Sequence, residues 1–274
     1  MYFTQLRVMN NTCGLSHQHG GLLLQPVWDY FLHRREWLLS PYLAAGVAFF
    51  SHLLICAPFL ALDVVRCRWL ALNRYKISGN SELAVCVRLW FNSVLRIFWN
   101  YLICILPATV ILHRLRSSKM PALAPTCWQA LWQIASSLFL FDALFYFWHV
   151  VMHRVPWLYR RVHQAHHQNP DVFALTAQDA SAVELLCLQT IALCSATLVG
   201  CHPLSEIIFH LLNMWLAAED HCGYDLPWAL HKILPFFGGA PFHQLHHRKF
   251  RGNYAPYFKH WDRLFGTELT EETP

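Results

Sequence analysis

The sequence predicts an all-α, polytopic membrane protein, in which a bundle of spanning helices carries a cytosolic, histidine-rich cap that holds two metal ions. Three observations support this fold class. Hydrophobic residues make up 55% of the 274 residues and charged residues only 14%, whereas charged residues are about a quarter of an average soluble domain. Apolar runs as long as a bilayer is thick recur along the chain. Histidines gather in three short motifs at or beyond the ends of those runs.

The charge and the cysteines exclude some classes of protein. The net charge of +5 comes without any long run of Lys or Arg, so a nucleic-acid partner is not expected. Basic loops beside an anionic membrane leaflet account for it. The ten cysteines form no CxxC pair and several lie inside apolar runs, which indicates buried thiols rather than a disulfide framework.

Residues 1–40 are predicted to form an N-terminal lumenal or interfacial segment, and residues 41–274 one membrane-embedded domain. The first residues lack the apolar core of a cleavable signal peptide. Asn10 begins an Asn-Asn-Thr sequon, so it is a possible glycosylation site if the N-terminus is lumenal.

Apolar runs predict spans at about 42–65, 89–112 and 128–148, followed by a membrane hairpin over 183–218. The hairpin is broken by Gly-Cys-His-Pro at 200–203. The basic cluster from Arg66 to Lys76 is expected to be cytosolic by the positive-inside rule, which makes the N-terminus lumenal and puts His149 at the cytosolic end of the third span. An even number of crossings then returns the chain to the same side. The cytosolic cap is predicted to comprise 149–182 and 219–274.

The histidine motifs predict a metal centre. They are HxxxH at His149 and His153, HxxHH at His163, His166 and His167, and a second HxxHH at His243, His246 and His247. Residues three and four apart share a helix face, so each motif is expected to aim its imidazoles the same way. Eight imidazoles are more than one tetrahedral ion uses, which indicates two metals. Either HxxHH alone is a weak signal, and the joint pattern is a specific one.

The residue types favour iron without settling the metal. Imidazole suits zinc, copper, iron and nickel. Soluble di-iron bundles add carboxylates, and none lies inside these motifs. An all-nitrogen, two-metal site beside an apolar region suits oxygen activation next to a lipid, which favours iron and leaves zinc open.

With these motifs the chain resembles the fatty acid hydroxylase superfamily of membrane di-iron oxygenases, which includes sterol C4-methyl oxidases and sterol desaturases. HxxxH–HxxHH–HxxHH is its signature. Within it, the chain resembles the sterol hydroxylases that oxidise carbon 25 of cholesterol. The further stretches that carry this resemblance, from about residue 22 to 267, are LLLQPVWDYF, RYKI, VPWLYRRVHQAHHQN, GCHPL, EDHCGYDLPW and APYFKHWDRLFGT. Parts of the last two stretches, HCGYD and WDRLFGT, are shared with the C4-methyl oxidases.

The resemblance implies that the eight motif histidines are metal ligands and that His221, in its H-x-G-Y segment, is a ninth. It also implies two iron ions, O2, and electrons from NADPH through a reductase and cytochrome b5 or through cytochrome P450 reductase. The implied reaction is hydroxylation of cholesterol or a related sterol to 25-hydroxycholesterol in the endoplasmic reticulum membrane, which feeds oxysterol signalling. Because carbon 25 lies in the sterol tail, we expect the sterol to enter tail-first.

Three polar residues are candidates to support the ligands. Asp142 lies two helical turns before His149, where it either orients a ligand imidazole or bonds a neighbouring helix. Asp225 stands where some fatty acyl hydroxylases have another histidine, and is either an acceptor behind a ligand or a surface acid. Asn213, three residues after His210, has the same two possible roles as Asp142. Three histidines outside the signature, His202, His210 and His231, are expected to be structural.

Other functions compete with this one. Within the superfamily, the alternative is a sterol C4-methyl oxidase or another lipid hydroxylase or desaturase. From other classes, the alternatives are a zinc-dependent membrane hydrolase and a metal transporter. A transporter is expected to place its ligands at mid-membrane, and a zinc hydrolase to supply a general base such as the Glu of HExxH, which the sequence lacks.

Overall fold

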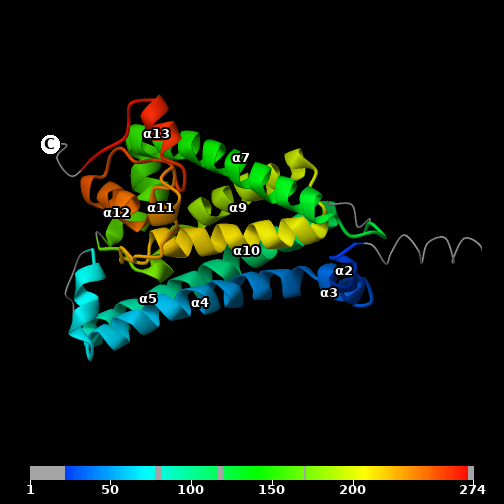
Figure 1. The fold of residues 1–274 in the computed structure, drawn as a ribbon, viewed down its shortest axis with the longest axis horizontal. Coiled ribbons are helices and arrows are strands. Elements are labelled where there is room, and N and C mark those ends of the chain that lie inside the picture. Colours follow the sequence, from blue (N-terminus) through cyan, green and yellow to red (C-terminus); the bar gives the residue numbers. More distant parts are fainter. Residues whose placement is uncertain (1–21, 78–81, 116–119, 170, 271–274) are drawn as a thin grey trace, which may run out of the picture.

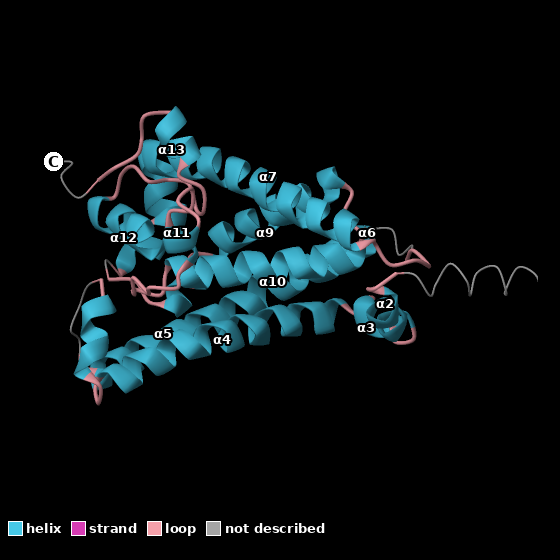
Figure 2. Cartoon of the chain, in the orientation of Figure 1, coloured by secondary structure: helices cyan, strands magenta, loops and turns pink. Residues whose placement is uncertain are grey.

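The computed structural model describes residues 22–77, 82–115, 120–169 and 171–270. The regular elements of this part are helices (Figure 2), which confirms the predicted all-α membrane bundle. The predicted glycosylation site at Asn10 lies outside the described residues. The longer helices are α2 (Gln25–Leu32), α4 (Pro41–Arg66), α5 (Leu83–Asn100), α6 (Leu106–Leu115), α7 (Cys127–Arg154), α9 (Ala182–Val199), α10 (Pro203–Asp220) and α12 (Gly239–Lys249).

Short helical turns join the long helices. Most of them lie at the end of the helix bundle that carries the histidines, where the backbone changes direction often. They are α3 (Arg35–Leu38), the 3₁₀ turn η1 (Leu70–Tyr75), the π turn η2 (Tyr101–Ile105), α8 (Pro156–Leu158), the π turn η3 (Tyr159–His163), the 3₁₀ turns η4 (His166–Gln168) and η5 (Ala174–Gln178), α11 (Leu230–Ile233) and α13 (His260–Leu264).

Four helical stretches of the described chain are long and apolar enough to cross a membrane, and they indicate a multi-pass membrane protein. They are Pro41–Arg66, Leu83–Leu115, Cys127–Arg154 and Ala182–Val199. The second stretch runs through α5, η2 and α6. Its π turn ends just before Pro107, because proline removes one backbone N–H and its ring clashes with the preceding turn.

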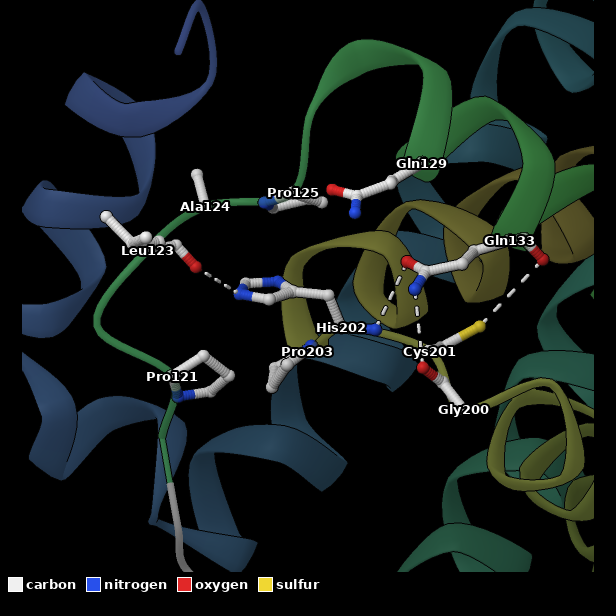
Figure 3. Close-up of a pocket in the computed structure, with 10 residues that line it drawn as sticks. All are labelled: Pro121, Leu123, Ala124, Pro125, Gln129, Gln133, Gly200, Cys201, His202 and Pro203. Carbon is white, nitrogen blue, oxygen red and sulfur yellow. Dashed lines mark hydrogen bonds between the residues drawn. The ribbon is translucent and has the colours of Figure 1, made fainter. Parts of the chain in front are cut away.

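The helices α9 and α10 cover the two halves of the predicted hairpin. Gly200 ends α9 with a φ of +72°, a left-handed conformation that glycine adopts freely. His202 then caps α10, because its Nδ1 accepts a hydrogen bond from the Leu204 N–H (3.1 Å). The other ring nitrogen donates to the Leu123 carbonyl (3.1 Å; Figure 3). His202 therefore joins the start of α10 to the Leu123 segment, beside an open recess of about 430 Å³.

The long helices place this turn and the histidines at opposite ends of the molecule. Figure 1 shows α10 lying between α7 on one side and α4 on the other, with α9 against α7 and α5 beside α4. The helices α11, α12 and α13 cover one end of the bundle, and α2 and α3 lie at the other. The cap is the end with α11–α13.

A short backbone ladder joins the end of the first spanning helix to the cap. Lys76 and Tyr224 form an isolated antiparallel bridge. The Ile77 N–H donates to the Gly223 carbonyl (3.1 Å) and the Asp225 N–H to the Tyr75 carbonyl (2.7 Å). Two sequence stretches of the family resemblance, RYKI and HCGYD, therefore meet in space.

Candidate metal centre

Three elements of the cap and the ends of α7 and α10 present the predicted histidines. α7 continues past the predicted end of the third span at 148 and runs to Arg154, so His149 and His153 lie one turn apart on the same helix. The first HxxHH spans η3 and η4, and the second lies on α12. His221 directly follows α10. The structure thus brings together side chains from residues 149 to 247.

The nine predicted histidines fall into two groups whose nitrogens all lie within 4.8 Å of one another inside each group. Group I is His149, His153, His163, His167 and His246. Group II is His166, His221, His243 and His247. The groups are adjacent, since the ring centroids of His167 and His247 are 4.4 Å apart. Eight of the nine imidazoles are buried, and His153 is partly exposed.

The expectation that each HxxHH aims its three imidazoles the same way is wrong. His163 and His167 join group I, but His166 between them joins group II. In the second motif His243 and His247 join group II and His246 joins group I. Successive α-helical residues are about 100° apart, so positions i and i+4 are about 40° apart while i+3 points about 60° to the other side. Each HxxHH therefore serves both groups. The first HxxHH is also not a regular α-helix, since a π turn and a 3₁₀ turn carry it.

The spacing of the Nε2 atoms fits one ion in each group. In group I, the Nε2 of His163 lies 2.9 Å from that of His149 and 2.9 Å from that of His167. In group II, the Nε2 of His243 lies 2.9 Å from that of His221 and 3.1 Å from that of His247. Two nitrogens that are each about 2.1 Å from one ion, about 90° apart, are about 3.0 Å from each other.

The tautomers of three of these imidazoles suit metal binding. His149 Nδ1 donates to the Tyr254 carbonyl (2.7 Å), His246 Nδ1 to the Gly252 carbonyl (2.7 Å) and His221 Nδ1 to the Ala217 carbonyl (2.8 Å). A neutral imidazole that donates from Nδ1 has only a lone pair at Nε2. These lone pairs point into crowded, buried nitrogen clusters, where a bound metal ion satisfies them. The donor set suits iron and zinc alike.

Burial keeps these imidazoles neutral. Desolvation, with repulsion from neighbouring imidazoles, lowers the pKa of His163, His243 and His247 well below the usual value of 6.5. Desolvation also lowers the pKa of His221 to about 4. The lone pairs are therefore free of protons at neutral pH, as metal ligands must be.

The loop after α12 positions His149 and His246. Its Gly252 has a φ of +63°, and a Cβ there would lie 2.5 Å from Leu269 Cγ and 2.7 Å from the Thr267 carbonyl oxygen, so only glycine fits. Asp262 accepts hydrogen bonds from the backbone N–H groups of Tyr254 and Ala255 (2.8 Å each). The WDRLFGT stretch therefore fixes the loop whose carbonyls orient two ligands.

The three supporting candidates do not contact an imidazole of either group. Asp142 accepts from the backbone N–H of Tyr257 (2.8 Å) and Phe258 (3.2 Å), which lie in the loop before α13 and not in a neighbouring helix. Asn213 accepts from the Tyr257 hydroxyl (2.8 Å). Asp225 binds His231 (2.7 Å) and Lys232 (2.8 Å). The first two residues hold the loop that follows Tyr254.

Two further histidines outside the groups, His231 and His210, have acidic partners. His231 pairs with Asp225, as above, and His210 lies 3.8 Å from Glu206. Neither belongs to a nitrogen cluster of the described residues. Their structural roles stay a prediction.

Glu184 is a polar contact of the centre that the sequence reasoning missed. Its Oε1 accepts a hydrogen bond from His163 Nδ1 (2.8 Å), and the side chains are 2% and 1% exposed. The sequence did contain a signal, since Glu184 is an ionisable residue inside the apolar run 183–218. Motif spacing gave no hint, because Glu184 lies 21 positions after His163.

Comparison with known proteins identifies the family. The fatty acid hydroxylase family model matches residues 134–267, which contain all nine histidines. A cholesterol 25-hydroxylase-like protein of Danio rerio is 42% identical over 246 residues, 89% of this chain and 97% of that protein. The chain belongs to the fatty acid hydroxylase family. The resemblance drawn from the histidine motifs is thereby confirmed.

Further relatives carry related names. The cholesterol 25-hydroxylase of Homo sapiens is 40% identical over 262 residues, 93% of this chain and 94% of that protein. A cholesterol 25-hydroxylase-like protein of Caenorhabditis elegans is 32% identical over 262 residues, 93% of this chain and 85% of that protein. No solved structure matches the chain. Membership of this family makes the chain a hydroxylating oxidoreductase that acts on lipid, which removes the zinc hydrolase and metal transporter alternatives.

Proposed function

We propose that this enzyme is an O2-dependent di-iron sterol hydroxylase that converts cholesterol to 25-hydroxycholesterol in the endoplasmic reticulum membrane. The observation that carries the proposal is the pair of adjacent, buried histidine groups, each with Nε2 atoms spaced for one ion. The relatives named cholesterol 25-hydroxylase support the sterol substrate.

Iron held by the nine imidazoles supplies oxygen activation and accepts the electrons that the reaction needs. The protein's own contribution is to fix the rings and exclude water. The Tyr254 and Gly252 carbonyls hold His149 and His246, and burial leaves the neutral nitrogens without solvent. No side chain is needed as a general acid or base in this arrangement.

The sterol is proposed to enter tail-first from the bilayer. His149 and His153 stand on the last turns of α7, a membrane-spanning helix, so the metal centre is reached along apolar helices. Carbon 25 is a tertiary carbon near the end of the sterol tail, with a comparatively weak C–H bond, while the 3-hydroxyl at the other end favours the polar interface. A trapped sterol with its 3-hydroxyl toward the histidines would contradict this orientation.

The electron donor is proposed to bind where group I approaches the surface. His153 is the partly exposed ligand, and the ring of Tyr159 lies 5.4 Å from it. Phe250, 45% exposed, lies 5.4 Å from the ring of His167. The segments 154–168 and 248–254 that carry these aromatic rings contain no acidic residue. Their exposed basic residues, here called the basic rim, are Arg154, Arg160, Arg161, Arg248, Lys249 and Arg251.

Such a surface suits an acidic electron-transfer protein, because complementary charge steers association. Cytochrome b5 with its NADPH-fed reductase is the proposed donor, and cytochrome P450 reductase the alternative donor. The topology follows from the same proposal: the histidine end and the C-terminus are cytosolic and the N-terminus is lumenal. Glycosidase treatment of full-length protein expressed in cells tests it, since a lumenal Asn10 can carry a glycan and a cytosolic one cannot.

The central experiment identifies the product. The full chain is expressed in sterol-supplied cells that lack such hydroxylases, under ¹⁸O₂, and the lipids are analysed by mass spectrometry. We expect ¹⁸O-labelled 25-hydroxycholesterol, which disappears with His163→Ala and persists with His210→Ala. Oxidation at the C4 methyl group would instead indicate a C4-methyl oxidase. No labelled 25-hydroxycholesterol from iron-loaded, folded enzyme would contradict the proposed substrate.

A further inference from the structure

Glu184 is a buried carboxylate that reaches the metal centre from the membrane hairpin. It lies in the first turn of α9, where Ser181 Oγ accepts a hydrogen bond from its backbone N–H (3.2 Å). The positive end of the helix dipole favours a negative charge at this position. Its side chain is 2% exposed, and one oxygen faces His163 Nδ1 at 2.8 Å. The residue is neither a surface acid nor a metal ligand.

The contact decides which nitrogen of His163 carries the proton. An ionised carboxylate can only accept from Nδ1–H, so with Glu184 charged the Nε2 of His163 is left with a lone pair. That Nε2 is central in group I, 2.9 Å from the Nε2 of both His149 and His167. The opposite tautomer would put a hydrogen among these nitrogens and close the position to a metal ion.

Group II has no equivalent contact. Among the hydrogen bonds of the described residues, no carboxylate binds an imidazole of group II, and His221 donates to the Ala217 carbonyl. The Glu184 carboxylate is therefore a difference between group I and group II. The two HxxHH motifs alone give no sign of this difference. A negative charge behind a ligand imidazole makes that imidazole more basic and the metal bond stronger.

On the basis of the proposed di-iron function, we propose that Glu184 is a positioning residue that fixes the His163 tautomer and selectively strengthens iron binding in group I. Removing its charge weakens one of the two iron positions and leaves the other as it is. Glu184 acts through His163 and does not touch substrate.

The test measures iron, not turnover. Full-length protein in lipid nanodiscs is loaded anaerobically with ⁵⁷Fe(II), and release to the chelator ferrozine is followed together with the Mössbauer spectrum. Glu184→Gln keeps the shape and removes the charge. The matched control is Glu206→Gln, since Glu206 is a buried acid in the first turn of α10, at the other end of the hairpin.

Wild-type enzyme is expected to hold two irons per chain. In Glu184→Gln one iron should leave about 10–100-fold faster, with a changed Mössbauer doublet for that iron only, as is typical when the partner of a ligand imidazole is altered. Glu206→Gln should release both irons as wild type does. Release from Glu184→Gln that matches this control, or equal acceleration of both irons, would overturn the inference.

If Glu184→Gln does not fold, Glu184→Asp carries the test. Its carboxylate is shorter by one methylene, so it should weaken the same iron position by a smaller factor, and unchanged release would overturn the inference. Failure of the proposed function gives a different result. In that case folded wild-type enzyme fails to bind two ferrous ions, whatever residue stands at position 184.

Discussion

Group I and group II contain the same side chain but are held in different ways. In group I, three Nδ1 atoms have acceptors outside the group: the Tyr254 carbonyl, Glu184 and the Gly252 carbonyl. In group II, His221 donates to the Ala217 carbonyl, whereas the Nδ1 atoms of His243 and His247 are buried without a hydrogen-bond partner among the described residues. The Nδ1 of His167 in group I is also without a partner among the described residues, so the protein orients more of the rings in group I than in group II, where orientation depends more on the ion itself.

Removing one ligand from each group tests this difference with the largest expected effect. His163→Ala and His243→Ala should each reduce hydroxylation by more than about 100-fold, because losing a ligand costs more than altering its partner. They should remove different irons, so the ⁵⁷Fe Mössbauer spectra of the two variants should show complementary losses. His210→Ala is the control, since His210 belongs to neither group.

Either of two results would contradict the assignment of two groups. If both variants lost both irons together, the nine histidines would form one cooperative cluster. If His210→Ala lost iron, the ligand set itself would be incomplete.

The backbone contact between RYKI (74–77) and HCGYD (221–225), here called the clasp, offers a way to weaken group II alone. Lys76 Nζ binds Asp63 Oδ1 (3.1 Å), the side chains are 10% and 3% exposed, and the Tyr224 hydroxyl donates to the same carboxylate. Lys76→Met removes the ammonium group that faces the buried Asp63 carboxylate, which should cost about 3–5 kcal/mol in the free energy of unfolding. Because His221 lies in the same HCGYD stretch as Tyr224, the group II iron should leave first. Thermal unfolding and ferrozine release measure the two effects.

The control for this substitution is Lys232→Met. Lys232 pairs with Asp225 at 2.8 Å, but the two side chains are 44% and 36% exposed. An ion pair in water contributes less than about 1 kcal/mol. Restored stability in the double variant Asp63→Asn with Lys76→Met would show that the unpaired charge caused the loss. Faster release from group I instead of group II would contradict the assignment of the clasp to His221.

The spanning helices and the eight motif histidines could be predicted from the sequence because each depends on local pattern, whereas His221 came from the family resemblance. Apolar length predicts a span, and His-x-x-x-His spacing predicts a shared face. Angular spacing separates i+3 from i and i+4, but it does not by itself predict that the two directions meet two different groups. That outcome depends on what faces the helix at positions i and i+3, which is set by the packing of η3, η4 and α12 around one another.

The supporting contacts were the least predictable part of the centre. Asp142 was a candidate because it shares a helix face with His149, but its carboxylate turns to the backbone of Tyr257. Glu184 comes from a different helix and reaches His163 only through the tertiary fold. A buried acid in an apolar span is a general signal of function, yet the sequence does not say which imidazole it meets.

Gly252 allows the support of group I to be altered without touching a ligand. Gly252→Ala combines a left-handed φ with a Cβ that would overlap Leu269 and the Thr267 carbonyl, which should cost about 2–3 kcal/mol. The displaced carbonyl should loosen His246 and accelerate iron release from group I alone. Gly266→Ala is the matched control: its φ is +66° but nothing lies within 4 Å of its Cβ, so only about 1 kcal/mol of strain is expected. Equal effects from both substitutions would show that the Gly252 carbonyl does not position His246.

The smallest effect is expected at the surface, where group I is exposed and group II is not. Arg160→Glu reverses one charge of the basic rim beside Tyr159, whose ring lies 5.4 Å from His153. Reduction by cytochrome b5 should become a few-fold slower at low ionic strength and match wild type at high salt, because exposed charges are screened there. Arg68→Glu, an exposed charge in the Arg66–Lys76 cluster, should change the rate less. If Arg68→Glu slowed reduction more than Arg160→Glu, the donor would bind beside the first span, and the exposure of His153 would not mark the point of electron entry.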